Sequence, residues 1–403
     1  MIALEKAGLP TVAIVAHGFE DDFEASAQVF GLPQVPYVVV PYTMTSRNRE
    51  EAAMDVDEVF DGLAKALVTQ PERPALTGTG KVLPAEQECF KGADRLEGWG
   101  SFNREFLERG LGDGFPLVAP TPQLVDAFLQ AAGKEPLEVV GHLAPANGVA
   151  TVERIAINAA MAGCQPEHLP ILIAAVEAIT QTPQSVFPVR TIAMSTGPHA
   201  MMMLVNGPIV KRLGINYGRC TLGPGKPGSV NTALGRALRL ILMNIGHSYP
   251  GEGDMDTIGS PLKYSMCIAE NEDENPWEPF HVERGFQREQ STVTIFGTMD
   301  VIHNANYQRN TDQLLLSWAA RASTASQYHH FIPTRLEWDA SHFTMLMCPD
   351  HARNLKEDGH TKESIREFVS KNAVTPLKWV LASSITSLDA LPSDAQWILQ
   401  TDP

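Results

Sequence analysis

The hydrophobic positions near the start of the chain form short apolar runs separated by amphipathic stretches. Residues 11–16 (TVAIVA) and 37–40 (YVVV) are β-branched and apolar, as expected of strands buried on both faces. Residues 19–30 and 55–68 repeat their apolar positions at helical spacing, which predicts two helices. A strand, a helix and a second strand in this order predict a parallel crossover unit. Two strands are too few for an independently stable sheet, so we expect further strands from elsewhere.

A stretch rich in proline and glycine follows this unit. Residues 71–81 (PERPALTGTGK) carry no apolar period, and the glycine-rich motifs GWGS and GLGDG come after them. We therefore expect a small α/β unit at 1–75, a connector at 76–114 and a larger domain at 115–403.

Within the larger domain, the pattern again alternates between strands and helices. Strands are predicted at 115–118, 137–142, 191–194, 201–205, 264–269 and 292–296. Helices are predicted from Pro122, with Thr121 as cap, and at 151–162, 168–179, 231–245, 311–323 and 362–371. The expected fold class is α/β, with mostly parallel sheets flanked by helices.

Composition and charge exclude several classes of protein. The 403 residues include 31 basic and 47 acidic side chains, a formal net charge of −16, and 44% are hydrophobic. The acidic balance argues against a nucleic-acid partner and against docking on anionic membranes. No apolar run reaches the about 18 residues of a membrane-spanning helix, and the N-terminus has no signal-peptide apolar core.

Cysteine usage indicates the cellular compartment. The five cysteines are Cys89, Cys164, Cys220, Cys267 and Cys348. No two of them lie at a CxxC spacing, which argues against a disulfide scaffold, a zinc ribbon and a thioredoxin-like dithiol. Their odd number and wide spacing predict a protein of the reducing cytoplasm.

The first candidate for chemistry is the glycine-rich turn at 223–229 (GPGKPGS), directly before the predicted helix at 231–245. Backbone N–H groups at a helix start favour an anion. The candidate ligand-binding residues are Gly223, Gly225, Lys226 and Ser229. The turn matches neither a Walker A loop nor GxGxxG, and the alternative is an ordinary loop with Ser229 as helix cap.

The second candidate is a group of polar residues after the predicted strand at 264–269. Cys267 and Glu270 lie near its carboxyl end, the edge at which α/β sheets form their sites. His281 and Glu283 alternate by two, so that on a strand they would share one face. The candidate catalytic residues are Cys267, Glu270, His281, Glu283 and Arg284, with Asn271 as a ligand-binding residue. The alternative is a buried cysteine, a surface ion pair and a hydrogen-bonded histidine.

Two chemistries remain open for this cluster. Cys267, His281 and Glu283 combine soft and hard ligands that would hold a divalent metal. Without a metal, the same side chains would supply an acid–base pair. No spacing matches a metal motif such as HExxH. His199 and His303, in loops beside predicted strands, are isolated further candidates.

Residues 5–42 (EKAGLPTVAIVAHGFEDDFEASAQVFGLPQVPYVVVPY) resemble the UGSC family of bacterial selenoproteins and cysteine homologues. That family is named for a Sec/Cys-Gly-Ser-Cys motif just upstream of a helix ending E-x-x-G-[ILV]-P-T. The matching helix here is residues 2–7, and the motif itself is not in the sequence. The resemblance therefore implies that the family's redox chemistry is absent from this chain.

Residues from about 110 to 375 resemble a second bacterial family without an assigned activity. The matching stretches include VNGP at 205–208, KYSMCIAEN at 263–271 and PWEPFHVERGF at 276–286. This resemblance favours the second candidate cluster and implies no reaction.

Two functions are therefore expected as alternatives. The first is an enzyme subunit that acts on a small acidic molecule by lyase or redox-related chemistry, with or without a metal, and with Arg284 or Lys226 on the acidic group. The second is a non-catalytic or half-site subunit whose partner carries the redox motif. Under both, the apolar strands at 11–16 and 37–40 predict a homo- or hetero-oligomer.

Overall fold

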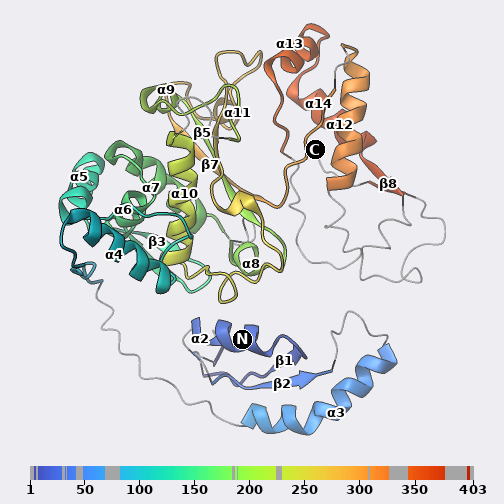
Figure 1. The fold of residues 1–403 in the computed structure, drawn as a ribbon. Coiled ribbons are helices and arrows are strands. Elements are labelled where there is room, and N and C mark those ends of the chain that lie inside the picture. The colour runs from blue at the N-terminus through green and yellow to red at the C-terminus, as the bar shows by residue number, and fades with distance from the viewer. Residues whose placement is uncertain are drawn as a thin grey trace. The chain divides into compact units, whose positions relative to one another are not determined.

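The structure is a computed structural model that describes residues 4–5, 8–29, 32, 34–41, 49–68, 82–183, 187, 189–223, 229–306, 309–325, 344–376 and 397–399. It divides into two compact units, drawn element by element in Figure 1. Unit 1 consists of Met1–Ala269 and Ser291–Met299, and unit 2 of Glu270–Gln290 and Asp300–Pro403. The division after Ala269 falls inside the segment 115–403 that the sequence predicts as one domain.

Unit 1 begins with the predicted crossover. Its elements are β1 (Ala13–Ala16), α2 (Glu20–Val29), β2 (Tyr37–Val40) and α3 (Arg49–Val68). The two strands pair in parallel, with Ala13 opposite Tyr37, as predicted. A small apolar cluster lies under α2 and consists of Ala27, Leu32 and Val35, with Phe23 against it.

Most of unit 1 is a helical layer around one apolar core. Its helices are α4 (Arg95–Glu108), α5 (Pro122–Ala132), α6 (Val152–Met161), η2 (Pro166–His168), α7 (Leu169–Gln181), α8 (Val189–Met194), α9 (Ile209–Leu213), α10 (Ser229–Asn244) and η3 (Pro261–Lys263). Thr121 caps α5 through its hydroxyl, as predicted, and Gly133 ends the helix at a φ of 62°. The fully buried core includes Phe128, Ile155, Leu172, Leu234 and Leu238.

A three-stranded sheet in the order β6-β5-β7 is covered by these helices. Its strands are β5 (Ala200–Asn206), β6 (Cys267–Ala269) and β7 (Thr292–Thr298). β5 and β6 are parallel, whereas β5 and β7 are antiparallel, with Asn206 opposite Thr292. The chain leaves β6 at Ala269 and returns at Ser291 to the same end of the sheet, so β7 must run in the opposite direction.

The prediction of an α/β fold is confirmed. The sheets are not mostly parallel as predicted, because antiparallel pairs outnumber parallel pairs among the described strands. Besides β5–β7, β3 (Val139–Leu143) and β4 (Gly148–Thr151) form an antiparallel hairpin. Residues 115–118 form no strand because the amide and carbonyl of Leu117 bind side chains of α4 instead of a neighbouring strand. Residues 191–194 belong to α8, since a short apolar run does not distinguish a strand from a helix.

Unit 2 contains the remaining elements. They are α11 (Phe280–Glu283), α12 (Thr311–Ala325), α13 (Pro349–Glu357), α14 (Lys362–Asn372), and the antiparallel pair β8 (Val374–Pro376) and β9 (Trp397–Leu399). Its own core brings together α12, α13 and α14 through Leu314, Leu315, Trp318, Leu355, Ile365 and Val369. Among the described residues, no helix combines the length and apolar character that crossing a bilayer requires.

Candidate functional site

Cys267 is a core residue of unit 1. It lies on β6, is 5% exposed, and its carbonyl accepts a hydrogen bond from the side-chain amide of Asn231. Burial raises the pKa of its thiol to about 12. Burial also raises the pKa of the neighbouring buried thiol, Cys164. At neutral pH both are protonated, and a protonated thiol is a poor nucleophile and a poor metal ligand.

Glu270 and Asn271 organise the segment that follows β6. The Glu270 carboxylate accepts the backbone N–H of Phe280 at 2.8 Å and the side-chain amide of Asn275 at 2.6 Å. It therefore caps the first turn of α11. Asn271 bonds the backbone and the carboxylate of Glu274 and so closes a turn. These hydrogen bonds give both predicted residues a local structural role.

The prediction that His281 and Glu283 share one face of a strand is wrong, because both residues belong to the helix α11. Two residues on a helix lie about 200° apart, so their side chains point in different directions. Glu283 forms ion pairs with Lys362, at 2.8 Å, and with Arg366. Burial raises the pKa of Glu283, but the hydrogen bonds from the two cations outweigh it and the net shift is downward. Arg284 stacks on the ring of Phe280, 3.4 Å from its centroid.

Unlike Glu270, Asn271 and Glu283, the predicted site residue His281 has no hydrogen bonds among the described residues that would give its side chain a structural role. It is 1% exposed, and neither ring nitrogen has a hydrogen-bond partner in the part of the chain that the structure describes. Its Nδ1 lies 3.7 Å from Oε1 of Glu272, beyond hydrogen-bonding distance. A buried nitrogen left unpaired costs roughly 1–3 kcal/mol, so His281 stays a candidate site residue.

The described residues do not fit the metal site expected at Cys267, His281 and Glu283. Nowhere among them are three or more His, Cys, Asp or Glu side chains placed to hold a metal ion. Both carboxylate oxygens of Glu283 bind cations, and the Cys267 thiol is neutral. Cys267 belongs to unit 1 and the other two to unit 2, so their convergence stays a prediction.

The glycine-rich turn is described only at its two ends. The backbone N–H of Gly223 bonds the carbonyl of Cys220, and Ser229 is the first residue of α10. Gly225 and Lys226 lie outside the described residues. The anion site predicted for this turn therefore stays a prediction.

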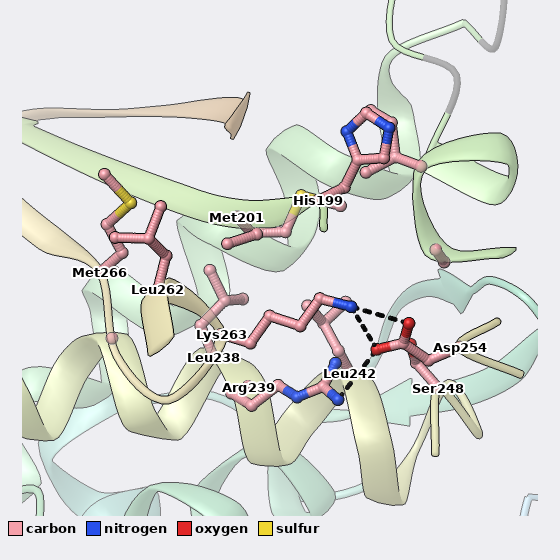
Figure 2. A pocket seen from close by; sticks show the side chains of 14 residues that line it. His199, Met201, Leu238, Arg239, Leu242, Ser248, Asp254, Leu262, Lys263 and Met266 are labelled. Carbon is pink, nitrogen blue, oxygen red and sulfur yellow. Dashed lines mark hydrogen bonds and ion pairs between the residues drawn. The ribbon is translucent and has the colours of Figure 1, made fainter. Parts of the chain in front are cut away.

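A pocket in unit 1, which we call the α10 pocket, lies between the start of β5 and α10 (Figure 2). Its labelled apolar side chains are Met201, Leu238, Leu242, Leu262 and Met266. Its polar side chains are His199, Arg239, Ser248, Asp254 and Lys263. They come from four separate segments, so the pocket exists only in the folded chain.

Two cations balance two buried carboxylates at the polar side of this pocket. Lys263 Nζ lies 2.8 and 2.9 Å from the oxygens of Asp254 and 2.7 Å from Oδ2 of Asp256. Arg239 Nη2 donates to Asp254 Oδ2 at 3.1 Å. Burial raises the pKa of Asp256, but the bond from Lys263 and the N–H groups of residues 258 and 259 outweigh it, so the net shift is downward.

The hydrogen bonds of the two cations differ. The ammonium of Lys263 donates two hydrogen bonds to Asp254 and forms an ion pair with Asp256. The guanidinium of Arg239 has five N–H donors but only one hydrogen bond among the described residues. It borders the pocket with its side chain 13% exposed. Arg239 can therefore bind a further acceptor without releasing Asp254.

The loop that carries Asp254 is fixed by close backbone contacts. A Cβ at Gly253 would lie 2.1 Å from the His247 carbonyl oxygen, so this position requires glycine. The backbone N–H and the hydroxyl of Thr257 bond the Thr196 carbonyl, which ties the loop to the segment before His199.

The size of the α10 pocket limits what it can hold. It contains about 460 Å³ of unfilled space, part of it open to solvent, and about 30 Å³ with room for water-sized molecules. One water needs roughly 10–15 Å³ of such room. The inner pocket therefore accommodates a small polar group, such as a carboxylate, and not a nucleotide.

Of the polar residues in this pocket, His199 is a candidate predicted from the sequence, as an isolated loop histidine, whereas Arg239, Asp254 and Lys263 are not. One signal was present: Arg236 and Arg239 interrupt an otherwise apolar helix. Charged residues within a buried helix need partners. Arg236 finds Asp113 at 2.7 Å, and Arg239 finds Asp254.

Comparison with known proteins bears on the N-terminal part of the chain. Residues 1–69 match the model of the UGSC family. This confirms the resemblance read from residues 5–42. No curated protein and no solved structure matches the chain. The α10 pocket and the residues around His281 lie outside the matched segment.

Proposed function

We propose that the protein is an enzyme subunit that acts on a small carboxylate-bearing molecule in the α10 pocket. The observation that carries the proposal is the hydrogen bonding of Arg239, a residue that lines the pocket and whose guanidinium has one partner, Asp254, among the described residues. A planar guanidinium binds a carboxylate through two parallel hydrogen bonds.

The charges around Arg239 support recognition of one acidic group. Asp254 and Asp256 neutralise Arg239 and Lys263, so the pocket carries no excess charge when His199 is neutral. An incoming carboxylate gains hydrogen bonds in a partly buried site, where they are stronger than in water. The apolar wall of Leu262 and Met266 contacts the rest of the molecule.

His199 is the proposed proton-transfer group. It is a lining residue of the pocket and directly precedes β5 (Figure 2). Histidine is the side chain most often used as general acid or base. Together with the carboxylate bound at Arg239, it supports acid–base chemistry of the lyase type. A redox reaction at Cys267 is less favoured because that thiol is buried and protonated.

Ligand binding by the intact chain tests this proposal. We would screen small carboxylic acids and their neutral amides by thermal shift, because a ligand that binds the folded state raises the midpoint temperature. The proposal expects stabilisation by acids and not by the matching amides. It also expects this stabilisation to disappear in Arg239→Gln and to persist in Arg104→Gln, a control on the exposed face of α4. Equal stabilisation of both variants by the same acid would overturn it.

A second candidate function is a half-site subunit completed by another chain. Among the described residues β1 and β2 pair only with each other, and Ile14 and Val39 are 46% and 36% exposed. Such a sheet edge accepts a further strand. Light scattering at micromolar concentration tests this, because a single 43.9 kDa species, alone and with candidate partners, would exclude it.

Five scattered cysteines, all free, support a cytoplasmic location for either function.

A further inference from the structure

A second pocket in unit 1, which we call the His168 pocket, has a volume of about 350 Å³. This lies within the roughly 300–1,000 Å³ typical of ligand sites. It is lined by the connection between α6 and α7, the end of α9 and the first turns of α10. The residues that matter for its chemistry are Glu167, His168, Arg212, Leu213, Val230 and Ala233. None of them lines the α10 pocket.

His168 provides a neutral hydrogen-bond donor in this pocket. It is 5% exposed, and its Nδ1 accepts the backbone N–H of Gln165 at 3.1 Å. A nitrogen that accepts a hydrogen bond carries no proton, so the ring proton lies on Nε2. Burial lowers the pKa of His168 more than the charge of Glu167 raises it. Nε2–H therefore remains a donor without a partner among the described residues.

Two opposite charges line the same pocket without pairing. Arg212 and Glu167 are both exposed, and neither side chain forms an ion pair in the part of the chain described by the structure. Beside them, Leu213, Val230 and Ala233 give the pocket an apolar side. A cation and an anion that line one pocket without pairing are complementary to a molecule that carries both charges.

We infer that the His168 pocket binds a zwitterionic small molecule of the α-amino acid type. The carboxylate would accept hydrogen bonds from Arg212 and from Nε2–H of His168, near the positive end of α10. The ammonium group would lie toward Glu167. The side chain would contact Leu213, Val230 and Ala233. This site does not depend on the function proposed for the α10 pocket.

Side-chain NMR of histidine in the full chain tests the inference, because His168 and His199 report on different pockets. The signals are assigned from the His168→Gln and His199→Gln variants. The probes are L-valine, isovalerate, which lacks the ammonium group, and isobutylamine, which lacks the carboxylate. We expect L-valine to shift the His168 signal and to bind about tenfold more tightly than either analogue, since each loses a charged contact.

Variants of the two exposed charged residues distinguish the contact with the carboxylate from the contact with the ammonium group. Arg212→Gln should weaken the binding of both L-valine and isovalerate. Glu167→Gln should weaken the binding of L-valine and leave that of isovalerate unchanged. Arg239→Gln, which removes the acid-binding group of the α10 pocket, should leave the affinity for L-valine unchanged. The inference is overturned if millimolar L-valine does not shift the His168 signal, or shifts only that of His199. It is also overturned if isovalerate binds as tightly as L-valine, which would indicate a simple anion site.

Discussion

Arg239 donates one hydrogen bond to Asp254, from Nη2 to Oδ2 at 3.1 Å, while Lys263 bonds the same carboxylate through both of its oxygens. Asp254 therefore keeps a cation when Arg239 is replaced. We expect Arg239→Gln to fold, to lose less than about 2 kcal/mol of unfolding free energy, and to bind small carboxylic acids at least about tenfold more weakly. Urea denaturation and calorimetric titration check the two expectations separately. A variant that binds the acids as well as the wild type would show that Arg239 is only structural.

Replacing Lys263 should have the opposite consequence. Lys263→Met leaves Asp256 without its cation, and both carboxylates of the cluster are about 5–6% exposed. Breaking such a buried pair costs about 3–5 kcal/mol. The unfolding free energy in urea measures this loss.

The matched control for Lys263 is Lys134→Met, which removes an exposed ion pair with Glu138. Exposed pairs contribute about 0–1 kcal/mol. If Lys263→Met is no more destabilising than Lys134→Met, the buried ion pairs of Lys263 contribute no more to stability than an exposed pair.

The reactivity of the five thiols follows from their burial. Cys89, Cys220 and Cys348 are exposed, whereas Cys164 and Cys267 are buried. Burial raises the pKa of the Cys267 thiol to about 12, so the reactive thiolate is scarce at pH 8. We expect three thiols to react rapidly with Ellman's reagent in the native protein and all five after unfolding. Rapid reaction of a fourth thiol would restore Cys267 or Cys164 as a redox candidate.

Folding stability should depend on pH through His168. Burial lowers its pKa below the ordinary value of 6.5, so the unfolded state binds the proton more readily than the folded state. The contribution is complete above about pH 6.5 and is lost as the pH falls below that value. We expect His168→Gln, whose amide can still accept the Gln165 N–H, to flatten the fall in unfolding free energy between pH 7 and pH 5. An unchanged slope in this variant would show that His168 is not the group responsible.

Local sequence patterns predicted the elements well where one physical signal dominated. The crossover of β1, α2 and β2 and the cap at Thr121 follow from apolar period and from helix-start chemistry, both of which are local. The antiparallel β7 was missed because its direction depends on where the chain re-enters the sheet, which no local pattern records.

The candidate site was predicted less well because polar density does not distinguish structure from chemistry. Glu270 and Glu283 lie in the most polar stretch, yet their carboxylates cap a helix and bind two cations. Arg239 and Asp254 are 15 residues apart in different elements, and nothing in either local sequence indicates that they meet. Only the charge within an apolar helix marked Arg239 as a residue that needs a partner.

The position of a bound acid in a crystal shows whether Arg239 recognises the carboxylate. A crystal of the intact chain with a brominated short carboxylic acid, such as 3-bromopropionate, would locate the ligand from the anomalous scattering of bromine. We expect the carboxylate within about 3.2 Å of the Arg239 guanidinium, with the bromine toward Leu262 and Met266, and no ligand there in Arg239→Gln crystals. An acid bound elsewhere with the α10 pocket empty, or the same occupancy in the variant, would contradict it.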